Sequence, residues 1–148
     1  MDDKAKELAE IALSPYAFLK FVKIQEPGEL SLRYELWNHL AEFYRLLELK
    51  KLIILIKSKQ IGISWALAVK SLRKIYTTPG SNVLMLSSGQ NESQALLEKV
   101  KIVYHNLPDW MKYTDLANKV PLILEPNSMS QFGFKQMGSL ITALPSTD

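Results

Sequence analysis

The feature that most constrains the fold is an aliphatic run that passes through a short polar turn into an amphipathic stretch. Residues 52–57 read LIILIK, and the stretch after Gly62 places Trp65, Val69 and Leu72 at helical spacing. A continuous aliphatic run is typical of a strand that is covered on both faces of a parallel sheet. The order strand, turn, helix therefore predicts one unit of an α/β fold.

A second strand and helix follow directly. Residues 82–88 (NVLMLSS) predict another buried strand, and residues 91–105 carry apolar side chains at helical spacing. The repeated order predicts a parallel sheet flanked by helices, with right-handed crossovers. After residue 112 the pattern changes, and three short strands are predicted over residues 120–125, 130–134 and 139–144.

For the N-terminal part of the chain, up to residue 49, the sequence predicts helices and no strand. Residues 3–12 and a segment that begins at Ser14-Pro15 predict short helices, because serine caps a helix and proline suits its first position. Apolar residues on one face predict a longer helix over residues 35–49. Residues 25–29 (QEPGE) predict a turn or linker between these parts.

Bulk properties exclude several kinds of protein. The chain has 148 residues, enough for one domain with a core, and it contains no cysteine, so disulfides and thiolate metal sites are excluded. His39 and His105 stand alone and are expected on helix surfaces. No apolar run reaches the ~20 residues of a membrane span. The acidic N-terminus does not resemble a signal peptide, which favours a cytosolic protein.

The turn between the first strand and its helix resembles a phosphate-binding loop, G-x-x-x-x-G-K-[ST], only in part. If Gly62 takes the second glycine position, Ser64 takes the hydroxyl position, Ile63 the lysine position and Lys57 the first glycine position. An ordinary strand–helix turn is the plain alternative, because glycine and serine are common there. Two cations inside the loop, Lys57 and Lys59, and the anion-attracting helix N-terminus favour a phosphate site.

The stretch KSKQIGIS resembles the deviant Walker A motif of the large terminase subunits of tailed bacteriophages. The resemblance extends over about residues 15–148: LSLRYELWNHL looks like the adenine-contacting segment upstream, and VLMLSSGQNESQALLEKVK looks like the strand and helix downstream. It implies an incomplete P-loop NTPase (RecA-like) α/β fold with short N-terminal helices. The implied nucleotide-binding residues are Lys57, Ser58, Lys59, Gln60, Ile61, Gly62, Ile63, Ser64 and Glu35.

The resemblance also implies roles and partners. Lys57 and Lys59 would be the catalytic cations, Ser64 would hold Mg²⁺, and ATP would be the substrate. The parent protein would be a DNA-packaging ATPase in the host cytoplasm. Its expected partners are double-stranded DNA, a portal protein, a small terminase subunit and further copies of itself. Residues 1–29 would form an N-terminal helical segment, and residues 30–148 would begin the ATPase domain.

Two departures from the family pattern matter. Glu35 stands where the family usually has an adenine-binding glutamine, and it is equally well explained as an acid at a helix N-terminus. The Walker B acid and the nuclease domain are missing, and Glu125 between two prolines reads as a strand-end residue. The chain is therefore expected to be the first part of a larger protein and to be inactive as an ATPase by itself.

Two other functions are consistent with the sequence. One is a different P-loop motor, such as a RecA-like helicase, and the other is an interaction module without enzymatic activity. The basic stripe Lys70, Arg73 and Lys74 suggests DNA contact, although such a stripe is more often only solvated. The net charge of +3 permits an anionic partner without requiring one.

Overall fold

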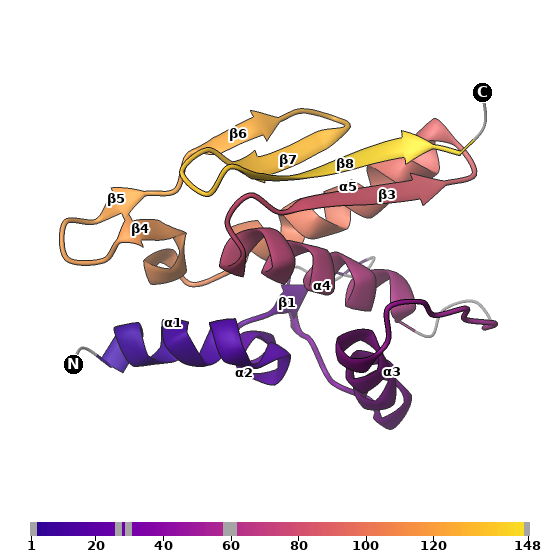
Figure 1. Cartoon of the computed structure of the whole chain (residues 1–148), viewed down its shortest axis with the longest axis horizontal. Helices are drawn as coiled ribbons and strands as arrows, with labels where there is room; N and C mark the ends of the chain where they lie inside the picture. The colour runs from indigo at the N-terminus through magenta and orange to yellow at the C-terminus, as the bar shows by residue number, and fades with distance from the viewer. Residues whose placement is uncertain (1–2, 26–27, 29–30, 58–61, 147–148) are drawn as a thin grey trace.

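The computed structural model describes residues 3–25, 28, 31–57 and 62–146. Its elements form layers, with a sheet on one side, two long helices beneath it, and the N-terminal helices below those (Figure 1). The fold is mixed α/β, as the sequence predicts.

Four strands form the sheet within the described part of the chain: β3 (Asn82–Ser87), β8 (Ser139–Pro145), β7 (Gln131–Phe134) and β6 (Leu124–Asn127), in that spatial order. Strands β3 and β8 are parallel, whereas β8, β7 and β6 are antiparallel neighbours. The sheet is therefore mixed and not parallel as predicted, and its parallel pair, β3 with β8, is not the expected pair of residues 52–57 and 82–88. Short loops join β6, β7 and β8, and such loops allow only antiparallel pairing.

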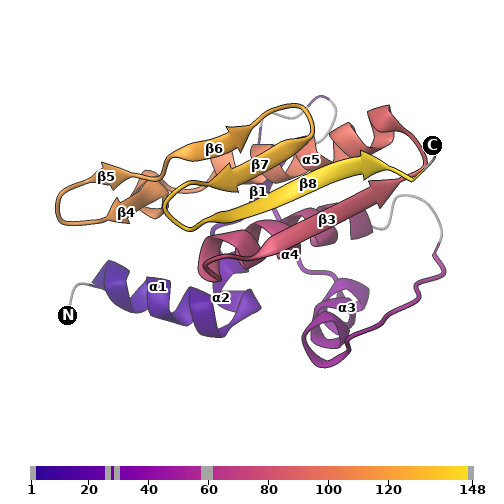
Figure 2. The same ribbon diagram turned by 45° about the horizontal axis from the view of Figure 1, so that its top comes forward.

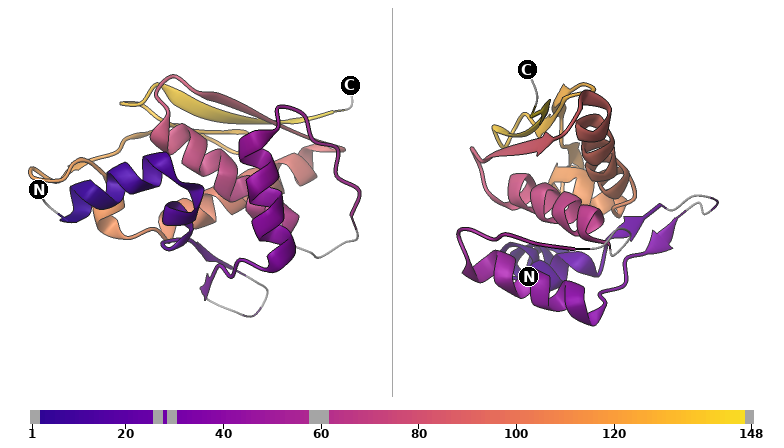
Figure 3. Two further views of the ribbon diagram at one scale, coloured as in Figure 1. Left: turned by 60° about the horizontal axis from the view of Figure 1, so that its bottom comes forward. Right: turned by 90° about the vertical axis from the view of Figure 1, so that its right-hand side faces the viewer.

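The helices that cover the sheet are α4 (Ile63–Thr77) and α5 (Gln90–His105). Both lie against the same face (Figures 1 and 3). Below them lie α1 (Asp3–Leu13), α2 (Pro15–Leu19) and α3 (Asn38–Leu49). The smaller elements are β1 (Lys23–Ile24) paired with β2 (Leu32–Arg33), a 3-10 helix at Asp109–Lys112, and β4 (Tyr113–Asp115) paired with β5 (Val120–Pro121).

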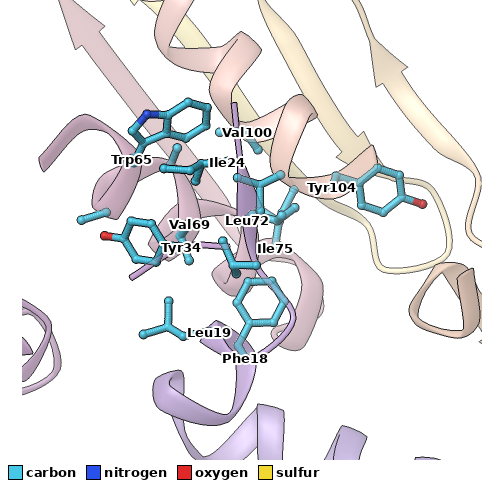
Figure 4. Close-up of a cluster of buried hydrophobic side chains, with 14 of the residues drawn as sticks. Phe18, Leu19, Ile24, Tyr34, Trp65, Val69, Leu72, Ile75, Val100 and Tyr104 are labelled. Carbon is cyan, nitrogen blue, oxygen red and sulfur yellow. The ribbon is translucent and has the colours of Figure 1, made fainter. Parts of the chain in front are cut away.

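The hydrophobic core lies between the sheet and the helices. Strand residues Phe132, Phe134 and Ile141 are fully buried, and so are Leu72 of α4 and Val100 of α5. The ring centroid of Tyr104 lies 5.3 Å from that of Phe134 and 5.6 Å from that of Phe132. Figure 4 shows how α2, α4 and α5 contribute side chains to one cluster. The periodicity of the sequence predicts this inward face of α4 and α5.

The expected strand at residues 52–57 is not formed, and this prediction is wrong. These residues are irregular, and Leu52, Ile54 and Ile56 are 83–96% exposed. Helix α3 precedes this segment in the chain and α4 follows it. The segment runs on the α3 side of α4, away from the sheet (Figures 1 and 3). No strand edge among the described residues lies beside it, so an aliphatic run alone does not make a strand.

The strand predicted at residues 82–88 does form, as β3, but it is buried on one face only. Met85 points into the core, whereas Leu84 and Leu86 are 59% and 57% exposed on the opposite face. Strand β3 is also the edge of the sheet within the described residues (Figure 2). The uniform aliphatic composition of this strand reflects two apolar faces, of which the structure covers one.

Candidate functional site

The N-terminus of α4 begins at a glycine in a conformation that other residues rarely adopt. Gly62 is the N-cap, with φ 78° and ψ 2°, and its carbonyl accepts the first helical hydrogen bond from the Ala66 amide at 3.1 Å. A Cβ at this position would also lie 3.3 Å from Leu40 Cδ1. Glycine is therefore strongly favoured here by the backbone conformation, and a Cβ would also require the Leu40 side chain to shift by a few tenths of an ångström. The first amides of α4 have no partners within the helix, which makes this end attractive to anions.

A pocket of about 330 Å³ opens beside this helix end. Its size lies at the lower end of the range for small-ligand sites. The pocket brings together the segment before α3 and the start of α4. Its lining includes Arg33, Tyr34, Glu35, Trp37, Gly62 and Trp65.

One wall of the pocket is aromatic. Trp65 is 8% exposed and packs into the core near Ile24 and Tyr34 (Figure 4), whereas Trp37 is 54% exposed. Lys99 Nζ of α5 lies 4.4 Å from the centroid of the Trp65 ring, which is a cation–π contact. Aromatic rings beside a carboxylate and a guanidinium offer stacking and hydrogen bonding to a planar polar ligand.

Tyr34 carries a buried hydroxyl at the same place. The residue is 7% exposed, and its hydroxyl makes no hydrogen bond of normal geometry with the described residues. Burial raises the pKa of the Tyr34 phenol, and the nearby Tyr44 hydroxyl partly offsets this rise. Tyr44 itself donates to the Ala66 carbonyl at 3.2 Å. A buried hydroxyl without a regular partner is unusual in a folded protein.

The structure brings together two of the residues predicted for the nucleotide site. Glu35 and Gly62 line the same pocket although they lie far apart in the sequence. Helix α3 begins at Asn38 with Trp37 as its N-cap, so Glu35 lies outside the helix. The structure therefore places Glu35 two residues before the N-cap of α3 and not in its first turn.

Other predicted site residues lie apart from this pocket or outside the described residues. Ser64 is exposed in the first turn of α4. Lys57 is also exposed and is the last described residue before residues 58–61. Neither belongs to the pocket lining. Ile63 is 5% exposed and belongs to the core, so only its backbone can contact a ligand. Ser58, Lys59, Gln60 and Ile61 lie outside the described residues.

The predicted site residues do not include four polar or aromatic residues of the lining, Arg33, Tyr34, Trp37 and Trp65. Arg33 and Tyr34 belong to the stretch LRYELW, in which charged and aromatic residues alternate ahead of a helix. The helical spacing of Trp65 predicts a place on the inward face of a helix, and the residue is both buried and part of the pocket. The alternation around Glu35 was the signal that could have revealed the first two.

The predicted basic stripe and the acid Glu125 have other roles. Arg73 donates to the carbonyls of Ile11 and Ala12 at 3.1 and 3.0 Å, and its side chain is 11% exposed. Lys70 forms an ion pair with Glu48. Glu125 lies within β6 and pairs with Lys135 at 3.3 Å, on the protein surface.

His39 and His105 are exposed at the start of α3 and the end of α5, as expected. Among residues 3–25, 28, 31–57 and 62–146, no three histidine or acidic side chains gather where they could hold a metal ion. Across the same described residues, no helix has the length and apolar character needed to cross a membrane.

Comparisons with known proteins find no matching family model and no curated protein of similar sequence.

Proposed function

We propose that the chain is the ATP-binding part of a viral DNA-packaging motor of the large terminase kind, with a P-loop NTPase (RecA-like) fold. In the proposed parent protein, ATP hydrolysis drives double-stranded DNA into a procapsid in the host cytoplasm. The portal protein, the small terminase subunit and other copies of the motor are its proposed partners.

The observation that carries this proposal is the convergence of Glu35 and Gly62 on one pocket at the N-terminus of α4. The sequence resemblance assigns Glu35 to the base and Gly62 to the phosphates. One nucleotide can contact both residues only if they lie no further apart than the length of the nucleotide. A helix N-terminus with a left-handed glycine before it suits a phosphate. The rings of Trp37 and Trp65 suit a planar base.

The proposed roles follow from the chemistry of each group. The first amides of α4 bind the β-phosphate, and Lys57 and Lys59 neutralise phosphate charge. The exposed hydroxyl of Ser64 holds Mg²⁺. The carboxylate of Glu35 accepts a hydrogen bond from the adenine amino group. Because the described residues contain no cluster of acids near this helix end, we expect binding without turnover.

The first test is a calorimetric titration of the protein with Mg-ATP and with adenosine. We expect Glu35→Ala to weaken both ligands by about 10–150-fold, because a hydrogen bond to a charged group contributes about 1.5–3 kcal/mol. Lys57→Ala should weaken Mg-ATP and leave adenosine unchanged, because adenosine has no phosphate. Thermal melting gives a second readout, since ligand at 100 times its Kd stabilises by about 2.7 kcal/mol.

The matched control is Glu98→Ala, which removes the same charge from an exposed position on α5 and should change neither affinity. Absence of both heat and melting shift at millimolar Mg-ATP would remove the nucleotide proposal. Equal weakening by Glu98→Ala would show that only overall charge matters.

A second candidate function is an interaction module that binds no nucleotide. The observation in its favour is the exposed aliphatic segment at residues 52–57, where a nucleotide-binding fold would have a buried strand. A chain that binds partners and fails the titration above would fit this second candidate.

A further inference from the structure

Two apolar features of the chain face solvent in this structure. The first is the segment Leu52–Lys57, which we call the aliphatic segment; Leu52, Ile54 and Ile56 are 83%, 85% and 96% exposed. Such a run of exposed aliphatic residues is unusual for a globular surface and marks an interaction site.

The second feature is the outer side of β3, which we call the open edge. Strand β3 pairs with β8 along one edge, and no strand of the described residues pairs with the other. The sheet face beside it carries Leu84, Leu86 and Leu144, which are 59%, 57% and 43% exposed. Leu86 and Leu144 are register partners, and Leu84 lies two residues before Leu86 on β3, so the three side chains lie on the same face of the sheet.

We propose that the aliphatic segment of one copy adds as a strand to the open edge of β3 in a second copy. This proposal concerns a partner, a second copy of this chain; it is argued from other observations than the pocket, although the segment ends at Lys57, which the proposed function assigns to phosphate. An open strand edge offers unpaired amides and carbonyls, and an extended aliphatic peptide satisfies them while its alternate side chains meet the neighbouring strand.

The two features match in length and character. The aliphatic segment and β3 both have six residues. On an added strand, alternate side chains such as Leu52, Ile54 and Ile56 would lie on one face, where β3 presents Leu84 and Leu86. Direct cross-strand pairs of aliphatic side chains stabilise such a contact.

The fold favours a second copy over pairing within one chain. The aliphatic segment runs on the α3 side of α4, and the sheet lies on the other side of that helix (Figure 3). Ile63 of α4 is buried, and Gly62 lies against Leu40 of α3, so the start of α4 is held in place. In this structure the segment and β3 of the same chain therefore lie on opposite sides of α4.

The apolar area suits a weak dimer in which each copy gives its segment to the other. Four side chains of the segment and three of the outer face are at least 43% exposed in each copy. At about 60–120 Å² per fully exposed side chain, scaled by these exposed fractions, two copies offer at most about 550–1,100 Å² of apolar surface. Stable interfaces bury about 1,200–2,000 Å², and the main-chain hydrogen bonds add to this contact.

The test is the molar mass of the whole chain by light scattering after gel filtration, over a range of protein concentrations. We expect a monomer–dimer equilibrium, weakened by at least about tenfold in both Ile56→Lys and Leu84→Lys. Leu13→Lys is the matched control, because Leu13 is 86% exposed on α1, outside both features. Circular dichroism establishes that each variant is folded.

Mixing the two variants tests whether the dimer forms by pairing of the aliphatic segment with the open edge or by some other contact between copies. Ile56→Lys keeps an intact open edge and Leu84→Lys keeps an intact segment, so the mixture should recover one of the two contacts and show mixed dimers. A wild-type chain that stays monomeric at high concentration would overturn the proposal. So would a dimer that Leu13→Lys weakens equally, or a monomer whose amides at 52–57 are protected from hydrogen exchange.

Discussion

At the scale of single residues, Arg73 shows how a charge on a basic helix face can serve the fold. It lies on α4 between Lys70 and Lys74, and its guanidinium donates to the carbonyls of Ile11 and Ala12 at the end of α1. The last carbonyls of a helix have no partners within it. A cation placed there also interacts favourably with the helix dipole.

Arg73→Ala should lower the free energy of unfolding by about 1–3 kcal/mol, because it leaves these carbonyls without their charged donor. Urea unfolding followed by circular dichroism measures the change. Lys74→Ala is the control; its side chain is exposed, and a change within about 0.5 kcal/mol is expected. If both substitutions had the same effect, Arg73 would be no more than a surface charge.

Single residues also show what the sequence could predict of the candidate site. The pattern around Gly62 predicted a glycine-led helix N-terminus, and the structure has a left-handed glycine there. The pattern predicted a role for Ile63 in the loop, but its side chain is buried in the core. Whether a residue at a helix start points inward depends on how the helix packs, and a local motif does not contain that information.

At the scale of elements, α4 and β8 are joined by one buried hydrogen bond. Ser139 Oγ donates to the Ile75 carbonyl at 2.6 Å. In a regular helix this carbonyl would accept from the amide four residues later, but that residue is Pro79, which has no amide hydrogen. The serine of β8 therefore supplies the donor that the end of α4 lacks.

Ser139→Ala should cost about 1–3 kcal/mol of stability, because it leaves a buried carbonyl unsatisfied. Ser81→Ala is the matched comparison, since Ser81 Oγ donates at 3.2 Å to the exposed end of the same helix, where Thr78 already donates to the Lys74 carbonyl. Chemical denaturation measures both. A neutral Ser139→Ala variant would mean that water replaces the hydroxyl.

The two aliphatic runs show why elements were predicted unequally well. Residues 52–57 and 82–87 have similar compositions, and only the second forms a strand. Strand β3 pairs with β8, which lies more than fifty residues further on. Local periodicity predicted the helices, whose hydrogen bonds are internal, but strand formation depends on a partner that the local sequence does not specify.

At the scale of the whole molecule, the sheet is covered by helices on one face, and its other face carries exposed leucines. The core holds three buried tyrosines, Tyr34, Tyr44 and Tyr104, and the half-buried Tyr76, and burial raises the pKa of each. Such groups do not titrate at neutral pH. Their burial links the stability of the whole core to alkaline pH.

The sign of this dependence follows from proton binding. Burial raises the pKa of Tyr104 to about 12, whereas an unfolded tyrosine has a pKa of about 10. Above pH 10 the unfolded chain releases its phenolic protons and the folded chain retains them, so the unfolding free energy falls as pH rises. The stabilisation is fully present below about pH 10 and is lost as pH rises through the folded pKa of about 12.

Urea unfolding at several pH values between 9 and about 12 should therefore show a steep loss of stability as pH rises. Tyr104→Phe should make that loss less steep, because it removes one phenolic proton that the folded chain retains and the unfolded chain releases. Because the side chain is 3% exposed, its share is at most about 2–3 kcal/mol across this range. Tyr16→Phe, on a ring that is 44% exposed, should leave the slope unchanged. An unaltered slope in Tyr104→Phe would show that this phenol ionises without unfolding the chain, and the alkaline transition would then belong to the other three tyrosines.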